Sequence, residues 1–144
     1  MNVEPYHDKH FLSVVELIKS FHEEAVKEYD HSIELDALVK TIEAQKKNAF
    51  VLTVQDVCVG VLSGHIIPSM LNSGLIFQET IWYVDEKFRS NGIKFLNEVK
   101  KFLKLRGVNI MIMVALENSK SEKLKRFYEH AGFKPLERHY VRGI

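Results

Sequence analysis

The stretch IWYVDEKFRSNGIKFLNEVKKFLKLRG, residues 81–107, decides how this chain folds. It begins as an apolar strand that ends at Val84, continues as a short polar loop, and reaches Arg89-Ser90-Asn91-Gly92, where an amphipathic helix begins. This order points several backbone N–H groups at one spot, and the positive end of the helix dipole reinforces them. Such a site can hold a phosphate group without a metal ion.

A second strand and a second helix follow. Residues 109–116 form an unbroken apolar run, which predicts a strand at the centre of a sheet that is covered on both faces. The next segment predicts a helix that carries Tyr128 and is closed by Gly132. A strand–helix–strand unit over residues 75–116 predicts parallel pairing of its two strands with a right-handed crossover.

The first half of the chain predicts two amphipathic helices and then three strands in an antiparallel meander. Gln55-Asp56 marks a tight hairpin turn, and Gly60 and Gly64 suggest a bulge or the close approach of another backbone. The predicted fold class is a mixed α/β (α+β) sheet, mostly antiparallel, with helices on both faces, formed by one domain over residues 1–144. The expected elements in this half are a strand at 3–6, helices at 11–24 and 33–42, and strands at 49–54, 57–67 and 75–84. At the other end of the chain, a last strand is expected at 135–141.

The composition is that of an ordinary globular protein. The net charge of +1 gives the chain no overall attraction to nucleic acid or to acidic lipid. Cys58 is the only cysteine and lies in an apolar run, which predicts a core residue and no intramolecular disulfide. No apolar run approaches the roughly 20 residues of a membrane span, and we expect a cytoplasmic protein without a membrane or a specific nucleic-acid partner.

Two segments of the chain, in register, resemble the GNAT acyltransferase superfamily. The first is Arg89-Ser90-Asn91-Gly92-Ile93-Lys94 after a strand that ends in an apolar residue, which is similar to the family signature Arg/Gln-x-x-Gly-x-Gly/Ala. The second is Asn118 after the next strand, followed by a helix that ends in FYEHAGF, residues 127–133. The chain's ending is similar to the small GNAT proteins of phages and prophages. Lys94 departs from the signature, since a small residue there lets the helix approach a pyrophosphate closely.

The resemblance implies acetyl-CoA as acyl donor. The backbone N–H groups of Arg89, Ser90, Asn91, Gly92, Ile93 and Lys94 would bind the pyrophosphate, and the ammonium of Lys94 either points away or adds to the phosphate contacts. The N–H of Val84 would polarise the thioester carbonyl. Asn118 would either bind the pantetheine arm or cap the last helix. The splayed strands at Val84 and at 109–116 would admit that arm as an extra strand.

The resemblance also implies the catalytic groups. Tyr128 matches the general acid that protonates the departing thiolate. Glu79 matches the base that deprotonates the amine, directly or through water, and simple alternation groups it with Phe77, Ile81 and Tyr83 as a partly buried carboxylate. His65 and His139, both on expected strands, are alternative bases.

The implied activity is acetyl transfer to a primary amine of a small molecule or a protein, by direct attack in a ternary complex. The alternative is a catalytically silent GNAT-fold binding or structural protein, for which Lys94 is the argument. His7 and His10 are three residues apart, but no third ligand follows, and no metal is predicted. The last strand, residues 136–141, is a candidate edge for a homodimer.

Overall fold

The computed structural model describes residues 1–27, 32–116, 120–140 and 142–144. The chain forms two compact units, Met1–Val114 and Ala115–Ile144. Within the described ranges, no helix has both the length and the apolar character that crossing a membrane requires.

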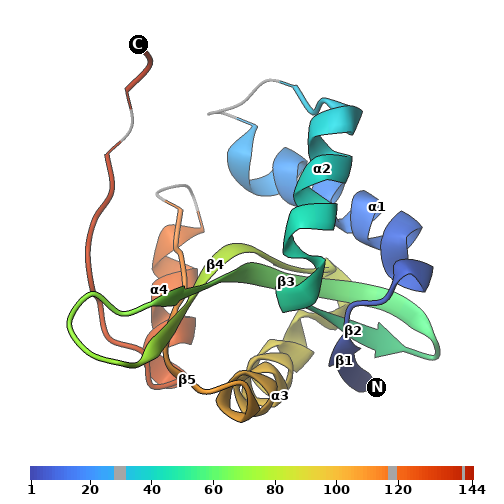
Figure 1. The fold of residues 1–144 in the computed structure, drawn as a ribbon. Helices are drawn as coiled ribbons and strands as arrows, with labels where there is room; N and C mark the ends of the chain where they lie inside the picture. The colour runs from blue at the N-terminus through green and yellow to red at the C-terminus, as the bar shows by residue number, and fades with distance from the viewer. Residues whose placement is uncertain (28–31, 117–119, 141) are drawn as a thin grey trace. The chain divides into compact units, whose positions relative to one another are not determined.

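The first unit is built on a five-stranded sheet whose strands lie side by side in sequence order (Figure 1). Strands β1 to β4 are antiparallel to their neighbours, and β5 lies parallel to β4. The predicted mixed, mostly antiparallel sheet and the parallel unit are therefore confirmed. The strands are β1 (Asn2–Pro5), β2 (Ala49–Val54), β3 (Val57–Pro68), β4 (Leu75–Val84) and β5 (Val108–Ile112).

The β2–β3 connection is the tight hairpin that the sequence predicts. Gln55 and Asp56 both have positive φ, 50° and 63°, which is the backbone of a type I′ turn. This turn matches the twist of the two strands, so the register of the hairpin is set locally.

Helices cover both faces of the sheet, as predicted. Helices α1 (Phe11–Phe21) and α2 (Leu35–Gln45) lie on one face, and α3 (Gly92–Leu105) lies on the other (Figure 1). Each helix buries one apolar stripe, and on α3 the stripe recurs at helical spacing because three to four residues complete a turn. The buried residues of α3 are Gly92, Phe95, Leu96, Val99 and Leu103.

Two helix boundaries differ from the expectation. The first helix ends at Phe21 and continues as a π-turn, His22–Val26, which changes the direction of the side chains that follow. The second helix begins at Leu35, with Glu34 at its N-cap and no capping side chain.

The expected strand 109–116 is shorter and less buried than predicted. Strand β5 ends at Ile112 and forms the edge of the five-stranded sheet, and Asn109 and Ile110 are exposed. The apolar run indicated a strand correctly, but it did not reveal that the pairing with β4 stops early.

The second unit holds helix α4 (Ser121–His130), which Gly132 closes with a φ of +87°. The predicted final strand is wrong over residues 135–140, which have no regular secondary structure, and residue 141 lies outside the described ranges. Leu136 and Tyr140 are mostly exposed, so no apolar face is buried that would favour a strand there. The proposed dimer edge therefore has no strand to offer in the described part of this segment.

Candidate active site

Strand β4 has two different halves. Residues 75–78, here called the paired half, are bonded to β3 on one side and to β5 on the other. Residues 79–84, the open half, pair with β3 alone, because the ladder with β5 stops at Gln78 and Ile112. Among the described residues no strand takes the place of β5, so an edge of backbone N–H and C=O groups is available to an extended ligand.

Glu79 stands where the two halves meet. Its side chain is 7% exposed, and its Oε2 accepts the backbone N–H of Val114 at 2.7 Å. The carboxylate thus takes an N–H group of the segment that follows β5, at the point where the strands have separated. Burial raises the pKa of Glu79 to about 7, and the hydrogen bond from Val114 acts in the opposite direction.

A β-bulge corrects the expected facing of Glu79. Gly64 pairs with Glu79 and Ser63 pairs with Ile81, so Thr80 is an extra residue in β4. The bulge shifts the alternation by one, which keeps Glu79 with Phe77 but places Ile81 on the other face, beside helices α1 and α2. The sequence expectation that Glu79, Ile81 and Tyr83 share a face is therefore wrong.

The bulge is held by side chains on the helix-covered face. The Oε1 of Gln45 accepts the hydroxyl of Ser63 at 2.9 Å and that of Thr80, which also lies 3.2 Å from the Ser63 carbonyl oxygen. These residues line a cavity of about 160 Å³ between α1, α2 and the sheet. Thr80 follows Glu79 directly in sequence, but its side chain lies on the opposite face of the sheet.

The backbone of Val84 points into the opening. The N–H of Asp85 donates to Val59 on β3, and successive strand residues direct their backbone groups to opposite sides. The N–H of Val84 therefore points away from β3, on the side that β5 has left. Its carbonyl oxygen accepts Nε of Arg89 at 3.2 Å, which fixes this peptide at the end of the strand.

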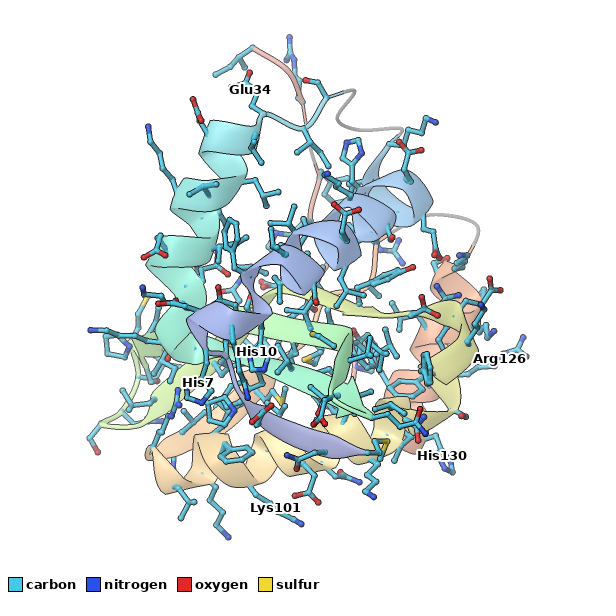
Figure 2. All side chains as sticks on the ribbon, turned by 90° about the vertical axis from the view of Figure 1, so that its right-hand side faces the viewer. His7, His10, Glu34, Lys101, Arg126 and His130 are labelled. Atoms are coloured by element: carbon cyan, nitrogen blue, oxygen red, sulfur yellow. The ribbon has the colours of Figure 1, made fainter. Side chains whose placement is uncertain are left out.

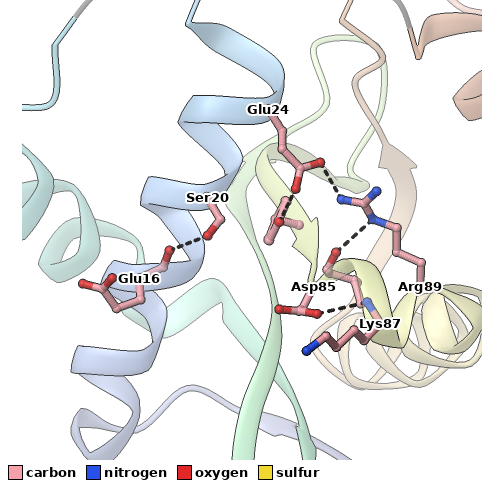
Figure 3. Close-up of polar contacts among 8 residues, drawn as sticks. Glu16, Ser20, Glu24, Asp85, Lys87 and Arg89 are labelled. Atoms are coloured by element: carbon pink, nitrogen blue, oxygen red, sulfur yellow. Dashed lines mark hydrogen bonds and ion pairs between the residues drawn. The ribbon is translucent and has the colours of Figure 1, made fainter.

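The loop after β4 leads directly into α3. A 3-10 turn, Glu86–Asn91, begins with the carboxylate of Asp85 accepting the N–H of Lys87 at 3.0 Å (Figure 3). Gly92 is buried where α3 begins, and its N–H donates to the carbonyl of Arg89. Lys94 is exposed. A 3-10 turn and a buried glycine thus lead directly from the open half of β4 to the N-terminus of α3.

Sequence reasoning missed Glu24. Its carboxylate, on the π-turn after α1, receives hydrogen bonds from Tyr83 and Arg89 (Figure 3). The side chain of Arg89 is thus directed at Glu24 and Val84. No motif links positions 24 and 89, and the helical period breaks at Phe21, so the sequence carried no signal for this contact.

Tyr128 lies in the second unit. It is buried at 8% exposure, and its ring contacts those of Phe127 and Phe133 at centroid distances of 6.0 and 5.5 Å. Asn118 lies outside the described residues.

None of the histidines proposed from the sequence has a hydrogen bond or ion pair with Glu79 among the contacts of the described residues. His65 is exposed on β3, and His139 is exposed and contacts Glu137 at 3.0 Å. His7 and His10 lie near each other before α1 (Figure 2), but Nδ1 of His10 accepts the N–H of His7 and its Nε2 lies 3.2 Å from Glu4. Both ring nitrogens of His10 are engaged, which favours a structural role.

The sequence also matches a known protein family. A family model described as "Acetyltransferase (GNAT) domain" matches residues 17–143. The chain belongs to the GNAT acetyltransferase family. A comparison with curated protein sequences finds no match.

Several solved structures with the same fold are described as acetyltransferases. The aminoglycoside acetyltransferase meta-AAC0020, from an uncultured soil metagenomic sample, is 17% identical, with a TM-score of 0.77 over 99% of this chain and 95% of its own. A ribosomal-protein-alanine N-acetyltransferase from Brucella melitensis biovar Abortus 2308 is 16% identical, with a TM-score of 0.78 over 99% and 98%. AAC(6')-Iy in complex with a bisubstrate CoA analogue is 14% identical, with a TM-score of 0.76 over 99% and 97%. At sequence identities of 14% to 17%, the structural similarity establishes a shared fold but not a shared function.

Proposed function

We propose that this GNAT protein transfers an acetyl group from acetyl-CoA to a primary amine by direct attack in a ternary complex, with residues 1–144 acting as one acetyltransferase domain. The observation that supports it best is the opening beside β4. There a buried carboxyl, Glu79, and a backbone N–H, that of Val84, belong to the same stretch of β4, which pairs with β3 but not with β5. A pKa of about 7 suits a group that must accept a proton near neutral pH.

The acyl donor would use the two features that the fold provides. Its pantetheine arm would pair with the open half of β4 as an added strand, with Asn118 as a further partner. Its pyrophosphate would take backbone N–H groups at the start of α3, where the helix dipole favours negative charge, and would displace the Arg89 carbonyl oxygen that accepts the N–H of Gly92 in this structure. The exposed ammonium of Lys94 can add to this attraction. The residues of this proposed binding site are Val84, Arg89, Ser90, Asn91, Gly92, Ile93, Lys94 and Asn118.

The chain's own groups would then carry the proton movements. Glu79 would take a proton from the ammonium, directly or through water, and the freed lone pair would attack the thioester carbon. The N–H of Val84 would donate to the thioester oxygen as negative charge develops on it. As the C–N bond forms and the C–S bond breaks, Tyr128 would give its phenolic proton to the thiolate, and the second proton that the nitrogen loses on becoming an amide would restore the phenol through solvent.

The acceptor we propose is a primary amine, of a small molecule or of a protein, in the cytoplasm. Two GNAT neighbours are described as aminoglycoside acetyltransferases and one as an N-acetyltransferase of ribosomal-protein alanine. Association of two copies is compatible with this function and would be measured by sedimentation. A silent binding protein of phage origin is the rival function, and Lys94 in place of a small residue is its one argument.

Calorimetric titration of acetyl-CoA into the protein is the first test. We expect a Kd in the micromolar range, about −8 kcal/mol, followed by amine-dependent release of free thiol in a screen of aminoglycosides, polyamines and peptides. Binding without thiol release from any amine would favour the silent alternative. Absence of binding in both the wild-type protein and Lys94→Gly would refute the acyl-donor site.

Tyr128→Phe tests the proposed acid. Because it removes only the phenolic oxygen, we expect turnover to fall about 100-fold while the calorimetric affinity for acetyl-CoA stays the same. Phe127→Leu, a neighbouring aromatic substitution, is the control for altered packing of α4. Unchanged turnover in Tyr128→Phe would remove this residue from the mechanism.

A further inference from the structure

Glu24 joins three segments that are far apart in sequence. Its Oε1 accepts the hydroxyl of Tyr83, on the open half of β4, at 2.5 Å. Its Oε2 accepts Nη2 of Arg89, in the 3-10 turn before α3, at 2.6 Å (Figure 3). One carboxylate therefore ties the end of α1 to both the strand and the loop of the candidate active site.

Arg89 connects Glu24 to the backbone of Val84. Its Nε donates to the Val84 carbonyl oxygen at 3.2 Å, while its Nη2 is bonded to Glu24. The guanidinium also lies 5.7 Å from the centre of the Tyr83 ring. A guanidinium is planar and rigid. Because Glu24 holds Nη2, the position of Nε is fixed as well, and so is the Val84 peptide to which Nε donates.

The protonation states of Tyr83 and Arg89 favour a stable contact with Glu24. Burial, together with the hydrogen bond to Glu24, raises the pKa of Tyr83 to about 12, so its hydroxyl keeps the proton that it donates. The Glu24 and Arg89 side chains are each about one-third exposed, 31% and 34%, so solvent screens the pair only in part. The guanidinium is charged at any physiological pH, and the contact persists wherever the carboxylate is ionised.

The π-turn explains why Glu24 occupies this place. A π-turn adds one residue to a helical turn and rotates all following side chains by about 100°. In this arrangement Glu24 faces Tyr83, whereas its neighbour Glu23 forms an exposed ion pair with Lys27 at 2.9 Å. Local π-geometry at a helix end is itself frequent at functional sites.

We propose that Glu24 is a positioning residue for acyl transfer. Through Arg89 it holds the Val84 peptide with its N–H directed into the opening beside β4, and through Tyr83 it holds the strand that carries this peptide. This inference rests on the proposed function for its catalytic consequence, but the ordering of residues 84–91 by Glu24 stands independently of it.

Glu24→Gln tests the inference, because the amide keeps one acceptor oxygen and loses the charge and the second acceptor. Glu23→Gln, one residue away and at the surface, is the matched control. Amide hydrogen exchange over residues 84–91 should become about tenfold faster in Glu24→Gln and stay at the wild-type rate in Glu23→Gln. In the thiol-release assay we expect kcat to fall about tenfold and the KM for acetyl-CoA to change less than threefold.

A double-substitution cycle separates positioning from general loss of stability. Arg89→Lys keeps the charge but cannot reach both Glu24 and Val84, so it should give a similar loss of kcat. The double variant should lose no more than either single variant, because the two side chains act through one contact.

Several outcomes would overturn the inference: unchanged exchange and unchanged kcat in Glu24→Gln, an equal effect in Glu23→Gln, or additive losses in the double variant. A wild-type protein that releases no thiol from any amine would refute the proposed function instead. In that event the hydrogen-exchange comparison of the two glutamine variants still decides whether Glu24 holds Val84.

Discussion

The two halves of β4 belong to one strand and yet differ in every way that matters for function. In the paired half, Phe77 is fully buried and the backbone is bonded to a strand on each side. In the open half, β3 is the only strand partner among the described residues, and two hydrogen bonds between a side chain and the backbone lie on the side where the ladder with β5 stops. Glu79 accepts the N–H of Val114, and Arg89 donates to the carbonyl of Val84.

This contrast shows how an enzyme fold can keep a sheet open. A strand edge left unpaired would close on a neighbouring strand or aggregate unless something holds it apart. Here a bulge, a buried carboxyl and an ion pair fix the opening while leaving backbone groups available. The paired half is bonded to a strand on each side, and the open half is where we propose that the acyl donor binds.

The largest effect is expected from Phe77→Ala in the paired half. Removing a fully buried ring costs its burial energy and leaves a cavity, and we expect the free energy of unfolding to fall by about 3–5 kcal/mol. Ile81→Ala, in the half-buried open half, is the comparison and should cost no more than about 2 kcal/mol. Urea unfolding measures both, and equal losses would erase the distinction between the halves.

Glu79→Gln should change how stability depends on pH. The unfolded carboxyl ionises near its ordinary pKa of 4.5, whereas the folded one keeps its proton up to about 7. Wild-type stability therefore contains a contribution that is complete below pH 4.5 and is lost as the pH rises to 7. The glutamine variant lacks this loss, and its stability relative to wild type should increase by about 3 kcal/mol between pH 4 and pH 8.

The control is Glu16→Gln, which replaces an exposed glutamate on α1. The stability of this variant should follow the wild-type pH profile. The same Glu79 variant should lose the acidic limb of kcat/KM, near pH 7. Parallel stability profiles for Glu79→Gln and wild type would show that Glu79 is not a buried, neutral acid at low pH.

Gly64→Ala tests the junction between the halves. An added Cβ would lie 2.2 Å from the Gln78 carbonyl oxygen and 2.8 Å from Cζ of Phe77, so the backbone at the bulge must move. We expect a loss of about 2–3 kcal/mol in urea unfolding. Gly143→Ala meets nothing within 4 Å and should be neutral. A neutral Gly64→Ala would mean that the junction is not tightly fitted.

Thr80→Val should have the smallest effect. It removes the hydroxyl that contacts Gln45 and the Ser63 carbonyl oxygen, at a cost of about 1 kcal/mol. Thr41→Val, whose exposed hydroxyl bonds only within its own helix, is the control and should change stability by less than about 0.5 kcal/mol. If both variants behave alike, the polar contacts of the bulge do not stabilise the opening.

Local sequence patterns predicted most of the fold. Strands β2 and β4, helix α3 and the hairpin at Gln55-Asp56 have the predicted bounds because alternation, helical spacing and turn residues act over a few neighbours. Alternation also predicts that Glu79 is a partly buried carboxylate, and in the structure it is buried at 7% exposure. The prediction of a final strand is wrong over residues 135–140, where the apolar side chains of Leu136 and Tyr140 are mostly exposed.

The sequence by itself determined the order of the helices and strands as far as α4, together with the GNAT resemblance. Only the tertiary structure decided the bulge at Thr80, the early end of β5 at Ile112, and the carboxylate of Glu24 between Tyr83 and Arg89. The reason is the sequence separation over which each kind of signal acts. Periodicity and turn propensity depend on residues a few positions apart, whereas a contact across 65 positions depends on where complete elements pack.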